Sequence, residues 1–532
     1  MINAPLPDRL RPRAARLGLA PYYGDIHNHS DLSYGHGAFP DALIKAALQL
    51  DFVSVTGHAH WPDMPVDDPS VAHIVDFHVK GFAKLRAAWP GHYDVLRGAE
   101  APGRFAVFPG YEIHSNAHGD YTIVLADLDG GPLEFADTPA GLKQALQARY
   151  GGRALAFPHH IGYRTGARGI NWATFDPELS PFVEMFSMHG CAETSENERG
   201  YLHSMGPVDG HSTMAHGLAE GHVFGVVGNT DHHSGFPGSY GHGRMSLLAP
   251  AHDRDAFWAA MQARRTTALT GDRIHLMAEI DGAVQGDVIA PRAGATLGIE
   301  AVAGGAIDCI DVIRNGVLWH RISPELDPSP VDPTAPDETL IHLELGWGAR
   351  GRHHAWEGQI ALDGGTIEAV EQRFRGPEIV SPLEGDDSGF PIPHIARDGD
   401  GVRFAVTAEA NPNNTTPTTQ GLMLRARLDP GATLRATLCG QEIVLPAARL
   451  SEGAKSGNLG PIDSPAWRFH QLPPATAWQW AGDLPLGALD AGETLYLRLR
   501  QKSGQMAWTS PIFVRPPGAT GPATTPTATE RE

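Results

Sequence analysis

Between residues 22 and 271, short apolar runs alternate with segments of helical periodicity, and this alternation restricts the fold more than any other feature. Strands that alternate with helices are typical of parallel sheets, whose carboxyl strand ends lie at one edge. Six of the apolar runs are followed by His, Glu or Asp, at residues 25–29, 56–60, 109–112, 158–160, 187–189 and 229–233. The pattern predicts a β/α barrel in which these side chains converge at one mouth.

The first of these strand ends carries His27 and His29, with one residue between them. Side chains two positions apart on a strand point to the same side, so both imidazoles can reach one ion. Neutral imidazole is the commonest protein ligand for zinc and related metals. Asp25 lies two residues earlier and could orient a ligand through a hydrogen bond. A metal site is therefore expected here, although His-x-His alone is a weak indication.

The chain has 532 residues, which is too long for one ordinary core, so we expect at least two domains. A net charge of −20 argues against a nucleic-acid partner, which needs a basic face. The three cysteines lie far apart, which indicates a reducing compartment, and we expect a cytoplasmic protein. No signal peptide or membrane-spanning run is recognisable, so no membrane partner is expected.

Four regions follow from changes of composition along the chain. Residues 1–20 are rich in Pro and Arg and are expected to form an N-terminal arm. Residues 21–272 hold the barrel pattern, with helices expected near 40–48, 139–149, 212–221 and 254–264; Ser212 is the expected cap of the third. Residues 273–516 show short β-like runs between Gly, Pro, Asp and Asn, which predicts an all-β, sandwich-like domain. Residues 517–532 form a Pro/Thr/Ala tail that we expect to be disordered.

Taken in order, the motifs of the first half resemble the PHP superfamily, named after its polymerase and histidinol-phosphatase members. The resemblance covers roughly residues 22–272, and some details resemble an uncharacterised branch with a β-rich C-terminal part. The matching motifs are His27-Asn28-His29-Ser30, Thr56-Gly57-His58, Pro109-Gly110-Tyr111-Glu112, His118, Pro158-His159-His160 and Thr230-Asp231-His232-His233.

This resemblance implies a distorted seven-stranded β/α barrel that holds two or three divalent ions, with Zn, Mn or Fe favoured by mixed His and carboxylate ligands. The first ion would take His27, His29, Glu112 and Asp231. The second would take Glu112, His118 and one of His159 or His160, with His114 as a competitor of His118. The third would take His58, His233 and His36, because Tyr34 stands where many members carry an aspartate.

The expected function is that of a metal-dependent hydrolase, in which a metal-activated hydroxide attacks a small, soluble phosphate ester. Asp231 would hold metal at the reacting centre, and His189 or His160 would protonate the leaving group. Arg164 and Arg168 would bind the anionic substrate, because guanidinium groups hold phosphate in bidentate fashion.

Two alternatives and one further property stay open at this point. The same site could cleave an ester, a lactone or a C–N bond, or run an elimination. The chain could also be a non-catalytic, metal-stabilised binding module. A homo-oligomer is compatible with the sequence.

Overall fold

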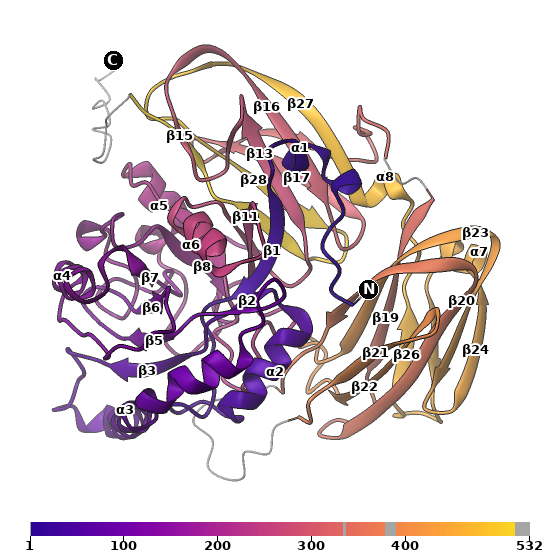
Figure 1. Cartoon of the computed structure of the whole chain (residues 1–532), viewed down its shortest axis with the longest axis horizontal. Helices are drawn as coiled ribbons and strands as arrows, with labels where there is room; N and C mark the ends of the chain where they lie inside the picture. Colours follow the sequence, from indigo (N-terminus) through magenta and orange to yellow (C-terminus); the bar gives the residue numbers. More distant parts are fainter. Residues whose placement is uncertain (1, 334–336, 378–389, 517–532) are drawn as a thin grey trace.

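The computed structural model describes residues 2–333, 337–377 and 390–516. The tail expected at 517–532 lies outside these residues. Over the described residues the chain is a mixed α/β protein with five β-sheets (Figure 1). The longer helices all lie in the first half of the chain, drawn in indigo to magenta, and strands dominate the second half.

Three predicted helices are confirmed, namely α2 (Phe39–Gln49), α4 (Pro139–Tyr150) and α6 (Arg254–Gln262). At the start of α4, the Thr138 hydroxyl accepts a hydrogen bond from the Gly141 N–H, and Pro139 occupies the first turn, where its missing N–H needs no partner. The cap expected at Ser212 is wrong by one residue, because the Thr213 hydroxyl accepts from the His216 N–H and opens α5 (Met214–Ala219).

The longest helix, α3 (Ala72–Ala99), was not expected from the sequence and contains Pro90. Three short helices complete the set in the described chain: α1 (Pro12–Arg16), α7 (Ala447–Glu452) and α8 (Ala475–Trp478). None of the helices in the described ranges, α3 included, combines the length and the apolar character that a membrane crossing requires.

The strands that carry the expected ligands fall into three sheets. In the first, β1 (Ala20–Asp25), β2 (Phe52–Val53) and β4 (Ala106–Val107) pair in parallel. In the second, β3 (Thr56–His60) pairs in parallel with β5 (Gly110–Ile113), and β6 (Tyr121–Leu125) and β7 (Ala154–Pro158) follow antiparallel. In the third, β8 (Phe182–Ser187) pairs in parallel with β10 (Gly225–Gly228) and antiparallel with β9 (Gly190–Cys191).

These ladders do not confirm the distorted seven-stranded β/α barrel that was expected. β1 pairs antiparallel with β11 (Arg244–Ala249), and β11 pairs antiparallel with β12 (Thr266–Leu269). Residues 114–120, between β5 and β6, are too few for the crossover that parallel neighbours need, so these two strands form an antiparallel pair. β7 lies beside β8, and β10 lies beside β12, without a continuous ladder.

The β-rich character predicted for residues 273–516 is confirmed, whereas the sandwich layering stays a prediction. One sheet has four strands: β13 (His275–Ile280), β14 (Ala283–Val284), β16 (Arg292–Val302) and β27 (Gln479–Leu489). Another has eight: β19 (Glu338–Gly346), β20 (His353–Arg373), β21 (His394–Asp398), β22 (Gly401–Glu409), β23 (Gln420–Leu438), β24 (Gln441–Pro446), β25 (Lys455–Asn458) and β26 (Ala466–Phe469).

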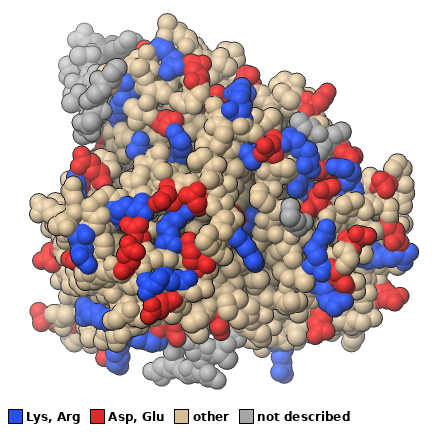
Figure 2. Space-filling view, in the orientation of Figure 1, with Lys and Arg blue, Asp and Glu red and all other residues tan. Residues whose placement is uncertain are grey.

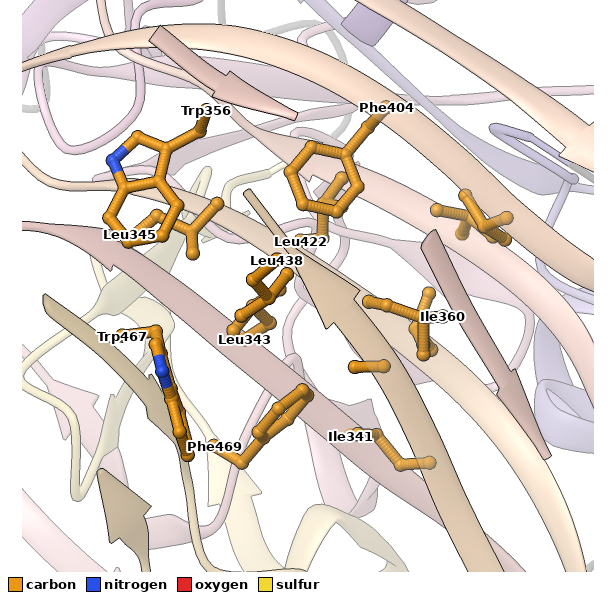
Figure 3. Close-up of a cluster of buried hydrophobic side chains, with 14 of the residues drawn as sticks. Ile341, Leu343, Leu345, Trp356, Ile360, Phe404, Leu422, Leu438, Trp467 and Phe469 are labelled. Atoms are coloured by element: carbon orange, nitrogen blue, oxygen red, sulfur yellow. The ribbon is translucent and has the colours of Figure 1, made fainter. Parts of the chain in front are cut away.

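The eight-stranded sheet buries one face, as the alternation of its strands requires. In β22, Val402, Phe404 and Val406 are buried and alternate with more exposed residues, because successive strand residues point to opposite faces. Figure 3 shows Phe404 beside Trp356 and other buried side chains from neighbouring strands.

The largest sheet joins the two halves of the chain. It contains β1, β2, β4, β11 and β12 together with β15 (Val288–Ile289), β17 (Ile307–Arg314), β18 (Val317–Ile322), β28 (Thr494–Gln501), β29 (Met506–Thr509) and β30 (Ile512–Val514). The link is the antiparallel pairing of β12 with β29, so the boundary proposed at 272/273 falls within a region that one sheet spans. The N-terminal arm also packs on the second half, where Arg13 Nη1 donates to Glu279 at 2.8 Å.

Basic and acidic side chains are interspersed over the face of the molecule drawn in Figure 2. The expected absence of a nucleic-acid partner stays a prediction.

Candidate metal centre

A buried cluster of histidines and carboxylates lies where the strands of the first half end. His27 and His29 follow β1, Glu112 lies on β5, and Asp231 follows β10. The Nε2 atoms of His27 and His29 each lie 3.3 Å from Glu112 Oε2. Asp231 Oδ1 lies 3.0 Å from His29 Nε2 and 3.4 Å from His27 Nε2. The four residues expected to hold the first ion are therefore brought together.

The two oxygens of the Glu112 carboxylate face different groups of histidines. Oε2 faces His27 and His29, whereas Oε1 lies 3.2 Å from His159 Nε2 and 3.2 Å from His114 Nδ1. The side chain of Glu112 is only 3% exposed. A carboxylate with ligand atoms on both sides has the arrangement that bridges two cations.

The spacing and the unmet bonding capacity of these atoms fit metal ions. Two ligand atoms that each lie about 2.1 Å from one ion, at tetrahedral to octahedral angles, are roughly 3.0 to 3.5 Å apart, close to the separations found around Glu112. His159 Nε2 is buried and has no hydrogen-bond partner among the described residues, although it points at Glu112. A buried nitrogen without a partner is costly unless something binds it.

Neighbouring side chains fix which nitrogen each histidine presents to the cluster. His27 Nδ1 donates to Glu184 Oε2 at 2.8 Å, and His159 Nδ1 lies 2.9 Å from the Thr122 hydroxyl. Both rings thus turn Nε2 towards Glu112. Glu184 also accepts from the Asn229 side chain at 3.0 Å, which holds the carboxylate in place. Such contacts orient metal-binding histidines and strengthen them as ligands.

A third group of ligand atoms comprises His29, His58 and His233. His58 lies on β3, and its Nδ1 is 3.3 Å from the Ser33 hydroxyl, which leaves Nε2 towards the cluster, 3.8 Å from Glu112 Oε2. The expected third ligand His36 belongs to none of the potential ligand groups found among the described residues. Its backbone N–H donates to the His233 carbonyl at 2.7 Å.

His114 takes the place in the cluster that was expected for His118. His118 is half-buried, and its Nδ1 lies 3.2 Å from the Thr174 hydroxyl, whereas His114 Nδ1 lies against Glu112 and 3.0 Å from Asp120 Oδ2. His114 directly follows β5 and stands two residues after Glu112, a spacing that places both side chains on the same side of an extended backbone.

Asp120 is a member of the cluster that the sequence analysis missed. It directly precedes β6, which pairs antiparallel with β5, and it belongs to none of the motifs that carry the resemblance. His160 Nε2 lies 3.3 Å from Asp120 Oδ2, and His159 Nε2 lies 3.9 Å from the same oxygen. Glu112, Asp120, His159 and His160 thus form a second set of potential ligands. Of the two adjacent histidines, His159 faces Glu112 and His160 faces Asp120.

The two arginines expected to bind substrate occupy different places. The Arg168 side chain is 16% exposed, and its Nε donates to the buried Asp120 Oδ2 at 2.7 Å, so its charge is already matched by this carboxylate. Its Nη2 also lies 2.6 Å from His114 Nδ1. Arg164 is exposed, and its carbonyl accepts the Ala167 N–H in a loop. A substrate contact by either residue stays a prediction.

His189 and His160, the expected proton donors, differ in access to solvent. His189 follows β8; its Nε2 lies 2.8 Å from Asp231 Oδ2, and its Nδ1 lies 2.6 Å from the Tyr163 hydroxyl. The His189 side chain is 10% exposed and the His160 side chain 3%. Burial, with a smaller effect of His159, lowers the pKa of His160 to about 3, which keeps this imidazole neutral.

The carboxylates of the cluster are held in the ionised form. Burial raises the pKa of Glu112, but His58, His159 and His114 outweigh it and bring the pKa well below its usual range. Burial is likewise outweighed at Asp231, where His27 and His189 lower the pKa. Ionised carboxylates and neutral imidazoles are the forms that bind metal.

Comparisons with known proteins add little to this geometry. No family model matches the chain. Uncharacterised proteins of Chlamydia trachomatis and Chlamydia muridarum are each 28% identical over 174 residues, which is 30% of this chain and 28% of each relative. The chain thus matches these curated relatives over less than a third of their length, and their names state no activity.

Two solved structures are similar at a low level. One is a two-domain protein from Bacteroides vulgatus described as containing a predicted PHP-like metal-dependent phosphoesterase; it is 14% identical, with a TM-score of 0.31 over 88% of this chain and 96% of that one. The other is PsfC from Pseudomonas syringae, 17% identical, with a TM-score of 0.29 over 47% of this chain and 91% of that one. At these scores neither likeness carries an argument. What stands is a mixed α/β protein with buried His, Asp and Glu groups that could hold metal ions.

Proposed function

We propose that this chain is a metal-dependent hydrolase that cleaves small, soluble phosphate esters. The observation that carries the proposal is the Glu112 carboxylate, whose Oε2 faces His27 and His29 while Oε1 faces His159. Cations bound on both sides would polarise a phosphoryl oxygen, lower the pKa of a water molecule towards neutrality and offset the charge of the departing oxygen.

The potential ligands divide into two principal metal positions and one further metal position. His27, His29, Glu112 and Asp231 would hold the first ion, and Glu112, Asp120 and His159 would hold the second, with His114 or His160 beside them. His58 and His233 would serve a third position next to His29. Nitrogen and carboxylate donors together favour Zn, Mn or Fe over an all-oxygen Mg or Ca site.

The remaining groups position the reaction. Glu184 and Thr122 fix the rings of His27 and His159, so little reorganisation is needed when substrate enters. His189 is better placed than His160 to give a proton to the departing oxygen, because it is the more exposed of the two. The proposed partner is a small phosphorylated anion in the cytoplasm, and neither nucleic acid nor a membrane is proposed as a partner.

The decisive experiment combines metal content with phosphate release. Protein purified without an affinity metal is analysed by inductively coupled plasma mass spectrometry, and a panel of phosphate esters, carboxylic esters and lactones is then assayed with the metal found. We expect two or three equivalents of Zn, Mn or Fe per chain, with phosphate release from the first class.

The matched variants are Glu112→Gln and Glu442→Gln. Glu112→Gln removes the charge of the bridging carboxylate and should abolish both metal retention and phosphate release. Glu442 lies on β24 and is exposed, so its variant should behave as the parent protein does. A protein that binds no metal even after reconstitution would refute the proposal. Metal binding with hydrolysis of carboxylic esters alone would refute the phosphate-ester assignment.

A further inference from the structure

A cleft of about 710 Å³ lies between the first half of the chain and the eight-stranded sheet. One wall is formed by residues of the segments 186–190, 198–202 and 240–242. The opposite wall includes His342 and Glu344 of β19, Arg373 of β20 and His470. The volume lies within the range of ordinary small-molecule sites.

The first of these segments contacts the cluster of histidines and carboxylates, and the other two lie near residues that flank it. Met188 and Gly190 line the cleft, and His189 between them lies 2.8 Å from Asp231. The ring of His203, next to the cleft residue Leu202, lies 4.8 Å from the ring of His189.

In the third segment, His242 lines the cleft. Its ring lies 4.8 Å from the ring of His232. His232 stands between Asp231 and His233. The cleft therefore lies next to the segment that carries His189, whose side chain is 10% exposed, whereas His27 and His29 are fully buried.

Arg199 brings a positive charge to this cleft without a carboxylate to match it. Its Nη2 donates to the Gly504 carbonyl at 2.9 Å, and its guanidinium lies 5.8 Å from the centre of the Phe186 ring. No carboxylate of the described residues forms a salt bridge with Arg199. The neighbouring Glu198 is bound instead by Arg500, and Arg373 lies 3.1 Å from Asp272.

The opposite wall contains the stacked rings of His342 and His470, and the carboxylate of Glu344, which already has hydrogen-bond partners. The rings of His342 and His470 stack with their centres 4.1 Å apart. Glu344 accepts from the Thr419 hydroxyl at 2.8 Å and lies 3.0 Å from His470 Nε2. The stacked imidazoles can pack on an organic group, and Arg199 lines the same cleft.

We infer that this cleft holds the leaving group of the substrate, and that Arg199 recognises a second anionic group on it. This inference rests on the proposed function and names its substrate class: a phosphate ester of an alcohol or phenol that itself carries a carboxylate or phosphate. A half-buried guanidinium without a counter-charge is stabilised by such an anion, which it can hold by two parallel hydrogen bonds.

The test uses two matched esters, 4-carboxyphenyl phosphate and phenyl phosphate, which differ by one carboxylate. For each, kcat/KM is measured from phosphate release by the metal-loaded full chain. The parent protein should prefer the carboxylated ester, and Arg199→Gln should reduce that preference about tenfold through KM, the loss expected for one charge-assisted hydrogen bond.

Two control variants separate recognition from folding. Arg199→Lys keeps the positive charge and should retain most of the preference, whereas a merely structural role would change both esters equally. Arg435→Gln alters a half-exposed arginine paired with Asp363 on β20, on another part of the protein, and should leave the preference as it is. If Arg199→Gln lowers kcat/KM equally for both esters, or lowers neither, the inference is overturned.

A binding measurement keeps this result distinct from the proposed function. Calorimetry compares 4-carboxyphenylphosphonate with phenylphosphonate, which cannot be hydrolysed, on the parent and Arg199→Gln proteins. Tighter binding of the carboxylated compound that is lost in the variant supports the anion site even if no ester is cleaved, in which case only the hydrolase proposal falls. Phosphate release without any discrimination in either assay removes the inference and leaves the hydrolase.

Discussion

His27 donates from Nδ1 to Glu184 at 2.8 Å, and this contact turns its other nitrogen towards Glu112. Both side chains are fully buried. The pKa of Glu184 is below its usual value, because His27 outweighs the effect of burial. The carboxylate therefore acts as a charged partner that keeps His27 in one orientation.

The first prediction follows from this pair. Glu184→Gln keeps the shape of the side chain but removes its charge, so metal affinity should fall about 10- to 100-fold. Competition with a chelator of known affinity measures this change. Glu178→Gln is the matched control, since Glu178 is 78% exposed and pairs with Lys143. Equal affinities of the Glu184 variant and the parent would show that the orientation of His27 does not depend on Glu184.

The second prediction distinguishes His114 from His118. His114 Nδ1 lies 3.2 Å from Glu112, whereas His118 binds Thr174, so His114→Ala should lower the metal content by about one equivalent and His118→Ala should not. Metal analysis of the two variants, purified side by side, gives the answer. The reverse result would restore the ligand assignment made from the sequence.

The third prediction concerns the largely buried pair of Arg168, 16% exposed, and Asp120, fully buried. Removing one partner of a buried ion pair costs about 3 to 5 kcal/mol, because the other charge is left uncompensated. Arg168→Met should therefore lower the thermal midpoint of the metal-free protein strongly, and the double variant with Asp120→Asn should recover part of the loss. Additive effects in calorimetry would contradict a direct interaction.

The fourth prediction concerns acid stability at Asp311, which accepts hydrogen bonds from Arg321 at 2.6 Å and Arg498 at 2.7 Å. Burial raises the pKa of Asp311, but these two arginines outweigh it, so its pKa is lowered in the folded protein. A lowered pKa stabilises the fold above the unfolded value of about 3.9, and the contribution is lost as the pH falls through the folded pKa.

Asp311→Asn should consequently be less stable than the parent at pH 6, and the difference should shrink below about pH 4. Urea unfolding at a series of pH values measures it. A difference that stays constant down to pH 3.5 would mean that the charge of Asp311 contributes nothing to stability.

The sequence was most informative where ligands follow a strand directly. His27, His29, Glu112, Asp231 and His233 were identified because each stands at or just after an apolar run, and the structure brings them within reach of one another. The same rule missed Asp120, which precedes an antiparallel strand, and the preference for His118 over His114 came from the resemblance to the PHP superfamily.

Pairing partners were the least predictable part of the fold. Apolar runs show that strands exist, but they do not show whether neighbours run parallel, and the short connection at 114–120 decides this for β5 and β6. The partnership of β12 with β29 joins residues that are distant in the chain, which local periodicity cannot reveal. The sequence alone likewise does not show that the Asp120 carboxylate offsets the positive charge of Arg168.

The pairing of β12 with β29 also bears on how the chain folds. Thr267 on β12 pairs with Thr509 on β29. The edge of the sheet beside β12 therefore stays unpaired during synthesis until the segment 506–509 has been made. Contacts between such distant residues slow folding, and an open strand edge can recruit another chain. A version of the protein cut at residue 272 would keep that edge exposed, and aggregation is the expected fate of such a fragment.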